Sequence, residues 1–327
     1  MLPISYPDVY SNILYAISGF SIPIHLFGGY CILFKTPLVM KSVKWTLFNL
    51  HFWSAALDIL LSLLAQPFLC SPFLAGFPLG ILKFAPTDVL VLVLKTVFML
   101  VPVSIISMFE NRYFILFVEN RPRRCWRYLR YPFLIINYLF GITYFIPIFL
   151  NVPSDQENAR RILFNMYPDA CEYVSDKNLV FVVDIGDIAW SKIRENALTF
   201  LLLSEIIVLA VVLRVKMSRA LKTAISGDTL RMQKKFLRAL NIQIAIPILL
   251  FFAPAATGIL TSQQTSNEQL EHNLFVITTS FHGVLSTILM IYLQKCYRDV
   301  FIGLFGCRKP DLAINTVVLP SIRFSIA

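Results

Sequence analysis

Charged side chains are scarce in this sequence: Asp, Glu, Lys and Arg together make up 15% of its 327 residues. Soluble domains are closer to a quarter charged. Hydrophobic residues account for 57% of the chain, and the mean hydropathy is +0.69. The shortage of charge excludes a soluble domain built around one core and indicates a protein that crosses a membrane several times.

The sequence also lacks the short motifs of common catalytic and metal sites. None of its four histidines lies in an H-E-x-x-H pattern, and its six cysteines show no C-x-x-C spacing. It contains neither a G-x-S-x-G motif nor a glycine-rich phosphate loop. We therefore expect a protein that is not an enzyme and that holds no metal and no cofactor.

Seven apolar runs are long enough to cross about 30 Å of hydrocarbon as helices, which takes roughly 20 residues each. They cover residues 10–34, 45–70, 88–117, 131–150, 196–213, 239–260 and 274–293. They predict an all-α bundle of seven transmembrane helices over residues 1–305, followed by a tail at 306–327. No internal repeat is visible, which argues against a transporter built from duplicated halves.

The basic residues that give the net charge of +10 lie in short loops between the apolar runs, which argues against a nucleic-acid partner. The loops after the first, third and fifth runs and the segment after the seventh carry 21 Lys and Arg, whereas the other loops carry six. Basic loops stay in the cytoplasm. This asymmetry predicts an N-terminus outside the cell and a cytoplasmic C-terminus.

Several polar residues and prolines interrupt the apolar runs. Asp58, Glu205 and His282 lie inside predicted spans, where ionisable groups usually face the bundle interior. For Asp58 two interpretations are open, a hydrogen bond that joins helices and an ion or switch site; Glu205 is a candidate for ligand contact. Pro247 and Pro254 are expected to kink the sixth span.

The third run ends in Glu110, Asn111, Arg112 and Tyr113, and a basic stretch follows. An ionised Arg is tolerated near the end of a span, where it reaches water or a partner. On an ideal helix, Glu110 and Arg112 point to different faces. Arg112 is therefore either an anchor at the membrane edge or a switch that opens toward a partner protein.

The cysteines suggest a disulfide and two modification sites. Cys70 ends the second run on the face that we expect to be oxidising, and Cys171 lies in the long loop on the same face, so a disulfide between them is one hypothesis. After the seventh run, residues 297–305 predict a short amphipathic helix on the membrane surface. Cys296 and Cys307 bracket this helix and are either palmitoylated or free thiols.

Several segments match a known family in order along the chain. They are Ser21-Ile-Pro-Ile-His25, Tyr30-Cys-Ile-Leu-Phe-Lys-Thr-Pro37, Asn49-Leu-His-Phe-Trp-Ser54, Leu74-Ala-Gly-Phe-Pro-Leu-Gly80, Phe109-Glu-Asn-Arg-Tyr113, Gln233-Lys-Lys-Phe236, Ile242-Gln-Ile-Ala-Ile-Pro247 and His282-Gly-Val-Leu-Ser-Thr287. The chain resembles the nematode serpentine receptors of class H, over about residues 18–305.

The resemblance implies a chemosensory G-protein-coupled receptor in the plasma membrane, in a sensory-neuron cilium. Its partners would be an extracellular small molecule, a heterotrimeric G protein and the lipid bilayer. Glu110, Asn111, Arg112 and Tyr113 would correspond to the acid–Arg–Tyr switch of rhodopsin-like receptors.

The chain departs from the rhodopsin-like pattern in two places. The seventh span has no Asn-Pro-x-x-Tyr, and the start of the third has no Cys. A ligand-gated channel or transporter is the alternative function, although no ring of like charges is present to line a filter.

Overall fold

The computed structural model describes residues 3–37, 40–70, 74–119, 125–150, 152–167, 171–172, 174, 176–184, 188–223, 242, 245 and 268–304. Its α-helices are α1 (Pro7–Phe34), α2 (Lys41–Ile59), α3 (Thr87–Phe117), α4 (Trp126–Thr143), α5 (Ile146–Leu150), α6 (Gln156–Met166), α7 (Ile188–Thr223), α9 (Glu268–Ser280), α10 (His282–Leu293) and α11 (Lys295–Leu304). Three short helical turns accompany them: η1 (Pro3–Ser5), the π-helical η3 (Leu60–Leu64) and η4 (Lys177–Leu179). The strands are β1 (Pro67–Leu69), β2 (Ala75–Pro78) and β3 (Phe181–Val182).

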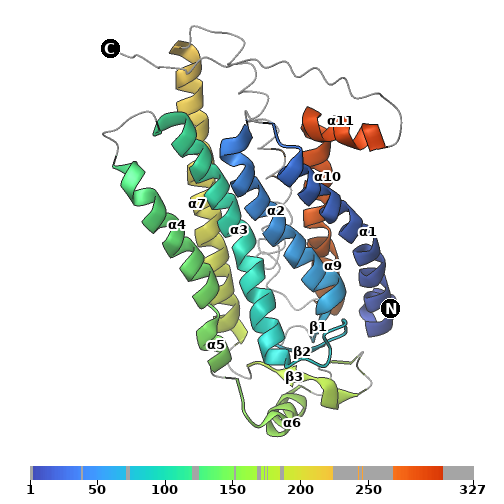
Figure 1. The fold of residues 1–327 in the computed structure, drawn as a ribbon. Coiled ribbons are helices and arrows are strands. Elements are labelled where there is room, and N and C mark those ends of the chain that lie inside the picture. The colour runs from blue at the N-terminus through green and yellow to red at the C-terminus, as the bar shows by residue number, and fades with distance from the viewer. Residues whose placement is uncertain are drawn as a thin grey trace.

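The bundle is arranged around α3, against which α2, α4 and α7 all pack (Figure 1). Every residue from Met99 to Asn111 is buried. A helix that is apolar and buried on all its faces belongs in the interior of a bundle. A second set of contacts joins α1, α2 and α10, so α2 belongs to both groups.

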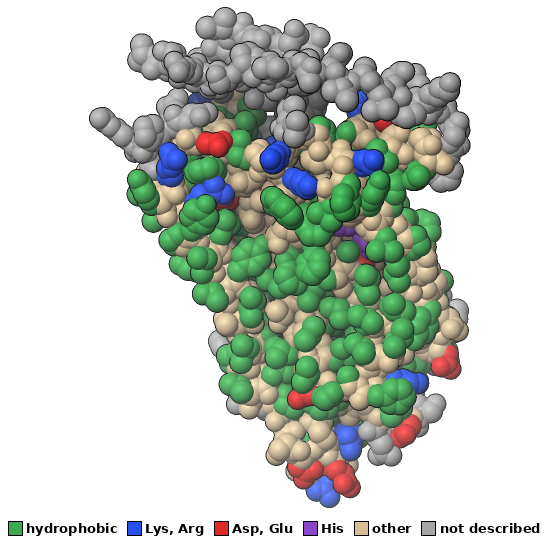
Figure 2. All heavy atoms as spheres, viewed as in Figure 1, with side chains coloured by type: hydrophobic (Ala, Val, Ile, Leu, Met, Phe, Trp, Pro, Cys, Tyr) green, Lys and Arg blue, Asp and Glu red, His purple; other side chains and the backbone are tan. Residues whose placement is uncertain are grey.

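The two ends of the bundle differ. The strands and α6 lie at the end where the chain begins, here called the sheet end, and α11 lies at the other, the α11 end (Figure 1). Hydrophobic side chains cover the middle of the face in Figure 2, and Lys and Arg side chains gather toward the α11 end. An apolar middle between polar ends is the surface expected of a bundle that spans a bilayer.

Within the described residues, five helical segments are long and apolar enough to cross a membrane. They are Pro7–Phe34, Lys41–Leu64, Thr87–Phe117, Ala197–Arg219 and Gln269–Leu293. They overlap the first, second, third, fifth and seventh predicted runs. The fourth run is represented by α4 and α5. Of the sixth, the structure describes only residues 242 and 245, so Pro247 and Pro254 lie outside the described residues.

The ends of two runs differ from the prediction for physical reasons. The second helix stops at Leu64, because Gln66 has a φ of 43° and Pro67 then begins β1. A residue before proline is disfavoured in helical conformation, and a positive φ ends a helix. α7 extends beyond 196–213 at both ends, since hydropathy marks the apolar part of a helix and not its polar continuations.

The seventh run is two helices, not one. α9 ends at Ser280 and α10 begins at His282, with Phe281 between them. The apolar pattern of residues 274–293 predicts a single continuous helix and does not anticipate this break. The break leaves the first N–H groups of α10 in need of acceptors in the interior of the bundle.

A small sheet covers the sheet end. β2 pairs antiparallel with both β1 and β3, in the order β1-β2-β3. A Cβ at Gly76 would overlap the carbonyl oxygen of Phe68, so only glycine allows this close approach. The chain between α5 and α7 thus contains the helix α6 and the strand β3, which pairs with β2.

Candidate functional site

The Asp58 carboxylate lies at the meeting point of α1, α2 and α10 and is fully buried. Its Oδ2 accepts from His25 Nε2 at 3.0 Å and from the Val284 N–H at 2.9 Å. Its Oδ1 accepts from His282 Nδ1 at 2.8 Å and from the Gly283 N–H at 3.3 Å. One side chain of α2 thus binds both neighbouring helices. We call Asp58, its four partners His25, His282, Gly283 and Val284, and the adjacent His51 and Thr287 the Asp58 centre.

Asp58 also accepts hydrogen bonds from the N–H groups that the break in the seventh run leaves without helical partners. The N–H groups of Gly283 and Val284 belong to the first turn of α10, where intrahelical acceptors are absent. A carboxylate at a helix N-terminus is favoured by the helix dipole as well as by these hydrogen bonds. The broken seventh run and the buried Asp58 are therefore two parts of one arrangement.

Two glycines allow the helices to approach this closely. A Cβ at Gly283 would lie 2.7 Å from Asp58 Oδ2 and 3.0 Å from the Ser54 carbonyl oxygen. A Cβ at Gly28 would overlap the Thr287 methyl group and lie 3.0 Å from His51 Cε1. Real Cβ atoms do not approach other atoms this closely, so larger residues would force the three helices apart.

His51 and Thr287 complete the centre on the side toward Gly28. His51 Nε2 donates to the His25 carbonyl oxygen at 3.0 Å, and the Thr287 hydroxyl donates to the Gly283 carbonyl oxygen at 2.7 Å. The exposed fractions of His25, His51 and Thr287 are 4, 9 and 3%. The whole centre is therefore shielded from water.

A second polar cluster lies at the α11 end of α3. Glu110, fully buried, forms an ion pair with Arg130 of α4 at 3.2 Å and accepts a hydrogen bond from Trp126 Nε1 at 3.0 Å. Asn111 accepts from Arg130 at 3.3 Å and donates to the Ser42 carbonyl oxygen of α2 at 3.1 Å. The end of α3 is thus joined to α2 and α4 by polar contacts.

The same end of α3 contacts α7. Lys216 Nζ donates a short hydrogen bond to the Tyr113 hydroxyl and lies 4.5 Å from the centroid of its ring. Of the four predicted switch residues, Glu110, Asn111 and Tyr113 therefore contact three different helices. Arg112, partly buried, is not the ion-pair partner of Glu110, as expected for two residues on different helix faces.

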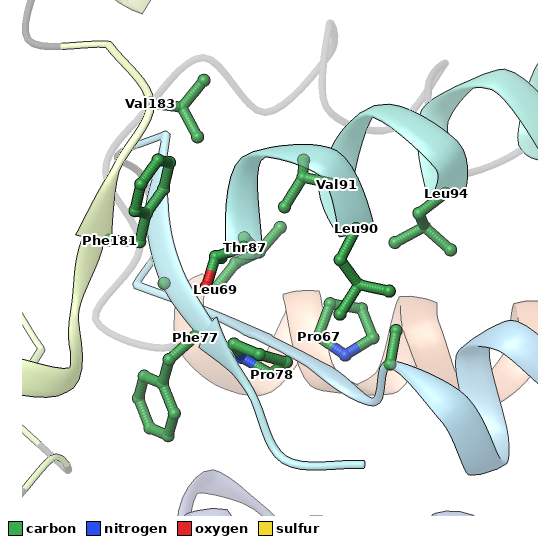
Figure 3. Close-up of a pocket in the computed structure, with 12 residues that line it drawn as sticks. Pro67, Leu69, Phe77, Pro78, Thr87, Leu90, Val91, Leu94, Phe181 and Val183 are labelled. Atoms are coloured by element: carbon green, nitrogen blue, oxygen red, sulfur yellow. The ribbon is translucent and has the colours of Figure 1, made fainter. Parts of the chain in front are cut away.

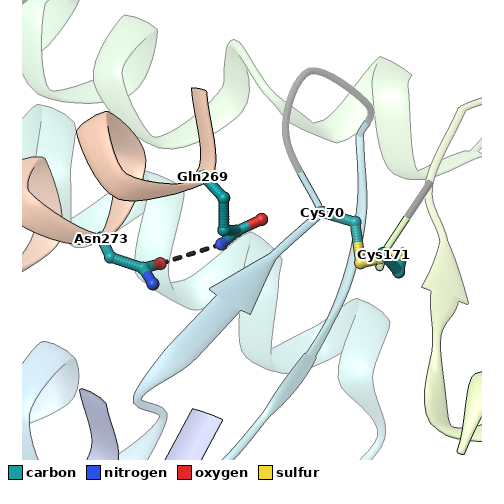
Figure 4. Close-up of a disulfide and its surroundings, with 4 residues drawn as sticks. All are labelled: Cys70, Cys171, Gln269 and Asn273. Carbon is teal, nitrogen blue, oxygen red and sulfur yellow. Dashed lines mark hydrogen bonds between the residues drawn. A yellow bond between two sulfur atoms is a disulfide. The ribbon is translucent and has the colours of Figure 1, made fainter. Parts of the chain in front are cut away.

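The structure joins Cys70 and Cys171 in a disulfide with a Cα–Cα distance of 5.0 Å (Figure 4). It connects the end of β1 to the loop before β3. Close by, Gln269 Nε2 donates to Asn273 Oδ1 at 3.0 Å, and Asn273 donates to the Ile4 carbonyl oxygen at 2.9 Å. The second of these contacts joins α9 to η1 at this end of the bundle.

An apolar cavity lies between the sheet and the start of α3, lined by residues such as Pro67, Phe77, Leu90 and Phe181 (Figure 3). Its volume is about 20 Å³. Ligand sites usually measure roughly 300–1,000 Å³. This cavity is too small for a ligand in the structure as it stands, and we assign it no ligand.

The remaining predicted residues lie apart from both clusters. Glu205 lies in α7, a helix that contributes no residue to the Asp58 centre. Cys296 lies in α11, where burial raises the pKa of its thiol and makes the reactive thiolate scarcer. Cys307 lies outside the described residues.

Sequence reasoning missed several residues of both clusters. The candidates taken from the sequence include none of His25, His51, Thr287, Trp126 and Arg130. A polar group every three to four positions along an apolar run is the signal that could have pointed to the histidines, since such residues share one helix face. No local pattern links Glu110 to Arg130.

Long apolar helices pack around α3, and a buried carboxylate lies where α1, α2 and α10 meet. Together these features define a multi-pass helical membrane protein. The profile of the serpentine type 7TM GPCR chemoreceptor family Srh matches residues 5–307. The chain belongs to this family, which confirms the resemblance seen in the sequence. It is similar to serpentine receptor class H-72 of Caenorhabditis elegans, at 29% identity over 314 residues that cover 92% of this chain and 87% of the relative.

Proposed function

We propose that the protein is a chemosensory receptor that binds an extracellular small molecule and signals to a heterotrimeric G protein at its α11 end. The observation that carries the proposal is the cluster at the end of α3. Three helices are joined there to α3 through side-chain contacts. A receptor needs two helix arrangements of similar free energy, which a ligand can bias through differential affinity.

The proposed orientation places the sheet end outside the cell and the α11 end in the cytoplasm. Lys35, Lys41 and Lys44, with the basic residues at the start of α4, at the end of α7 and in α11, lie toward the α11 end, in agreement with the positive-inside rule. The Cys70–Cys171 disulfide lies at the sheet end, and disulfides persist in oxidising compartments. The charges and the disulfide thus support the same orientation. As part of the proposal, the protein lies in the plasma membrane and, as a chemosensory receptor, in a sensory-neuron cilium.

Epitope tags at Met1 and Ala327 test this orientation. We expect antibody to reach the Met1 tag on intact cells and the Ala327 tag only after permeabilisation, because of the asymmetry of basic residues between the two faces. A cytoplasmic marker protein, stained in parallel, controls for membrane integrity. Staining of the Ala327 tag on intact cells would overturn the proposed topology.

A ligand screen tests the receptor function. Cells that express the protein and a calcium or cyclic-nucleotide reporter would receive a panel of extracellular small molecules, beside matched cells without it. We expect at least one compound to give a response that is lost when the Gα subunits are deleted. A ligand-evoked membrane current that persists without Gα would instead support the alternative, a ligand-gated channel.

A further inference from the structure

The hydrogen bonds of the Asp58 centre fix the positions of most of its protons. Asp58 accepts from two imidazoles and two backbone N–H groups, which occupy all four of its acceptor positions. The two backbone N–H groups can only donate, and each imidazole donates when the nitrogen that faces Asp58 carries its proton. Asp58 is therefore an ionised carboxylate, and the centre carries one buried negative charge when its histidines are neutral.

The same reasoning assigns one proton to each histidine. His25 must carry its proton on Nε2 to donate to Asp58, and His51 on Nε2 to donate to the His25 carbonyl oxygen. His282 must carry its proton on Nδ1, because that nitrogen faces both Asp58 and the Thr279 carbonyl oxygen, at 2.8 and 2.7 Å. A neutral imidazole has only one N–H, so Nδ1 of His25 and of His51 are then acceptors.

Both of these acceptors face the hydroxyl of Thr287. Its oxygen lies 3.5 Å from His25 Nδ1 and 3.4 Å from His51 Nδ1. The single hydroxyl proton is already donated to the Gly283 carbonyl oxygen at 2.7 Å. Three acceptors thus compete for one proton in a site shielded from water, and unsatisfied buried acceptors are costly.

We propose that the Asp58 centre is a proton-binding site, in which one proton from water forms an N–H bond at His25 Nδ1. The imidazolium then donates Nε2–H to Asp58 and Nδ1–H to the Thr287 oxygen. One proton supplies the missing donor and balances the carboxylate charge. His25 takes it in preference to His51 because only the His25 ring contacts Asp58 directly.

The titratable groups that face His25 within the described residues come from two helices. They are Asp58 and His51 of α2, which lie beside the His25 ring, and His282 of α10, which contacts the same Asp58 carboxylate. α9 contributes the Thr279 carbonyl oxygen, which contacts His282. Binding of the proton strengthens the contact between α1, α2 and α10, so acidity favours this helix arrangement by linkage.

Nitrogen NMR of ¹⁵N-histidine-labelled protein in lipid nanodiscs tests the site without any signalling step. The chain has four histidines, so His25→Gln and His272→Gln assign two signals directly. The glutamine introduced by His25→Gln keeps an N–H donor for Asp58, and His272 of α9 serves as the matched control. Spectra are recorded from about pH 5.5 to about pH 8. We expect the His25 ring to carry protons on both nitrogens at the acidic end of this range and to lose the Nδ1 proton toward its other end.

Thr287→Val supplies the second arm, because it removes the acceptor oxygen and keeps the side-chain shape. The pH at which the Nδ1 proton is lost should fall by roughly one unit or more, the effect of losing a hydrogen bond to a charged group. A His25 Nδ1 that stays unprotonated at the acidic end of this range, or a titration unchanged in Thr287→Val, would overturn the proposal. If both variants fail to fold, the wild-type spectrum at acidic pH decides. The proposal is overturned if that spectrum shows no doubly protonated histidine that is protected from exchange with solvent.

Discussion

Asp58→Leu is expected to remove most of the receptor from the cell surface. Leucine leaves the His25 Nε2–H and the Gly283 and Val284 N–H groups buried without their acceptor. Loss of one partner from a buried charged network costs about 3–5 kcal/mol, which is a large part of the stability of most proteins. Flow cytometry of an N-terminal tag and thermal unfolding of the purified protein in nanodiscs measure the two consequences.

Asp58→Asn separates the role of the charge from that of the shape. The amide keeps one acceptor oxygen, but its NH₂ group faces donors that previously met a carboxylate oxygen. We expect an intermediate loss of stability, smaller than for leucine. Asp299→Asn, which changes an exposed carboxylate of α11, is the matched control and should behave as wild type.

Adjacent glycines test the same centre without a change of charge. Gly28→Ala should lower surface expression, because its Cβ would overlap the Thr287 methyl group and press on His51. Gly29→Ala should have little effect, because the nearest atom to its Cβ is His51 Nε2 at 3.6 Å, an ordinary contact. Wild-type stability in Asp58→Leu, or equal effects of the two alanines, would contradict the importance of this centre.

The sequence indicated where the helices lie but not how they meet. Apolar length located the five helices of the described chain that are long and apolar enough to cross a membrane, because crossing a bilayer is a local requirement. The partners of Asp58 are 33 and 226 residues away along the chain, and no local pattern links them. Their proximity depends on how α1, α2 and α10 pack, which hydropathy does not encode.

The break at Phe281 was missed for a related reason. Residues 274–293 read as one apolar run, and the only local sign was His282-Gly283 in its middle. The break becomes favourable only when a distant carboxylate accepts from the new helix N-terminus. A tertiary contact thus decides a feature of secondary structure.

Basal signalling should rise when the contact between α3 and α4 is broken. Glu110→Gln keeps the side-chain shape but loses the negative charge that pairs with Arg130. If this pair stabilises the resting arrangement, we expect basal signalling to increase roughly five-fold or more, because a typical coupling free energy between two sites corresponds to at least that factor. Arg130→Gln should raise it similarly, whereas Arg127→Gln, an exposed neighbour in α4, should not.

The double variant decides whether the two residues act through one contact. If they do, Glu110→Gln with Arg130→Gln should signal no more than either single variant, because the shared contact is already lost. Additive increases would mean that each residue acts through separate partners. The comparison requires equal surface levels, measured with the same N-terminal tag.

Arg112→Lys is expected to keep surface expression and to lose most ligand-driven signalling. Lysine retains the charge and also reaches the membrane edge, so an anchoring role would survive the change. It cannot reproduce the planar guanidinium fork that a switch uses to exchange partners between the bundle and a G protein. Ligand-driven signalling at matched surface levels, with Arg127→Lys as the control, measures the difference. Undiminished signalling by Arg112→Lys would show that Arg112 only anchors the end of α3, and the switch would then have to lie with Glu110 and Arg130.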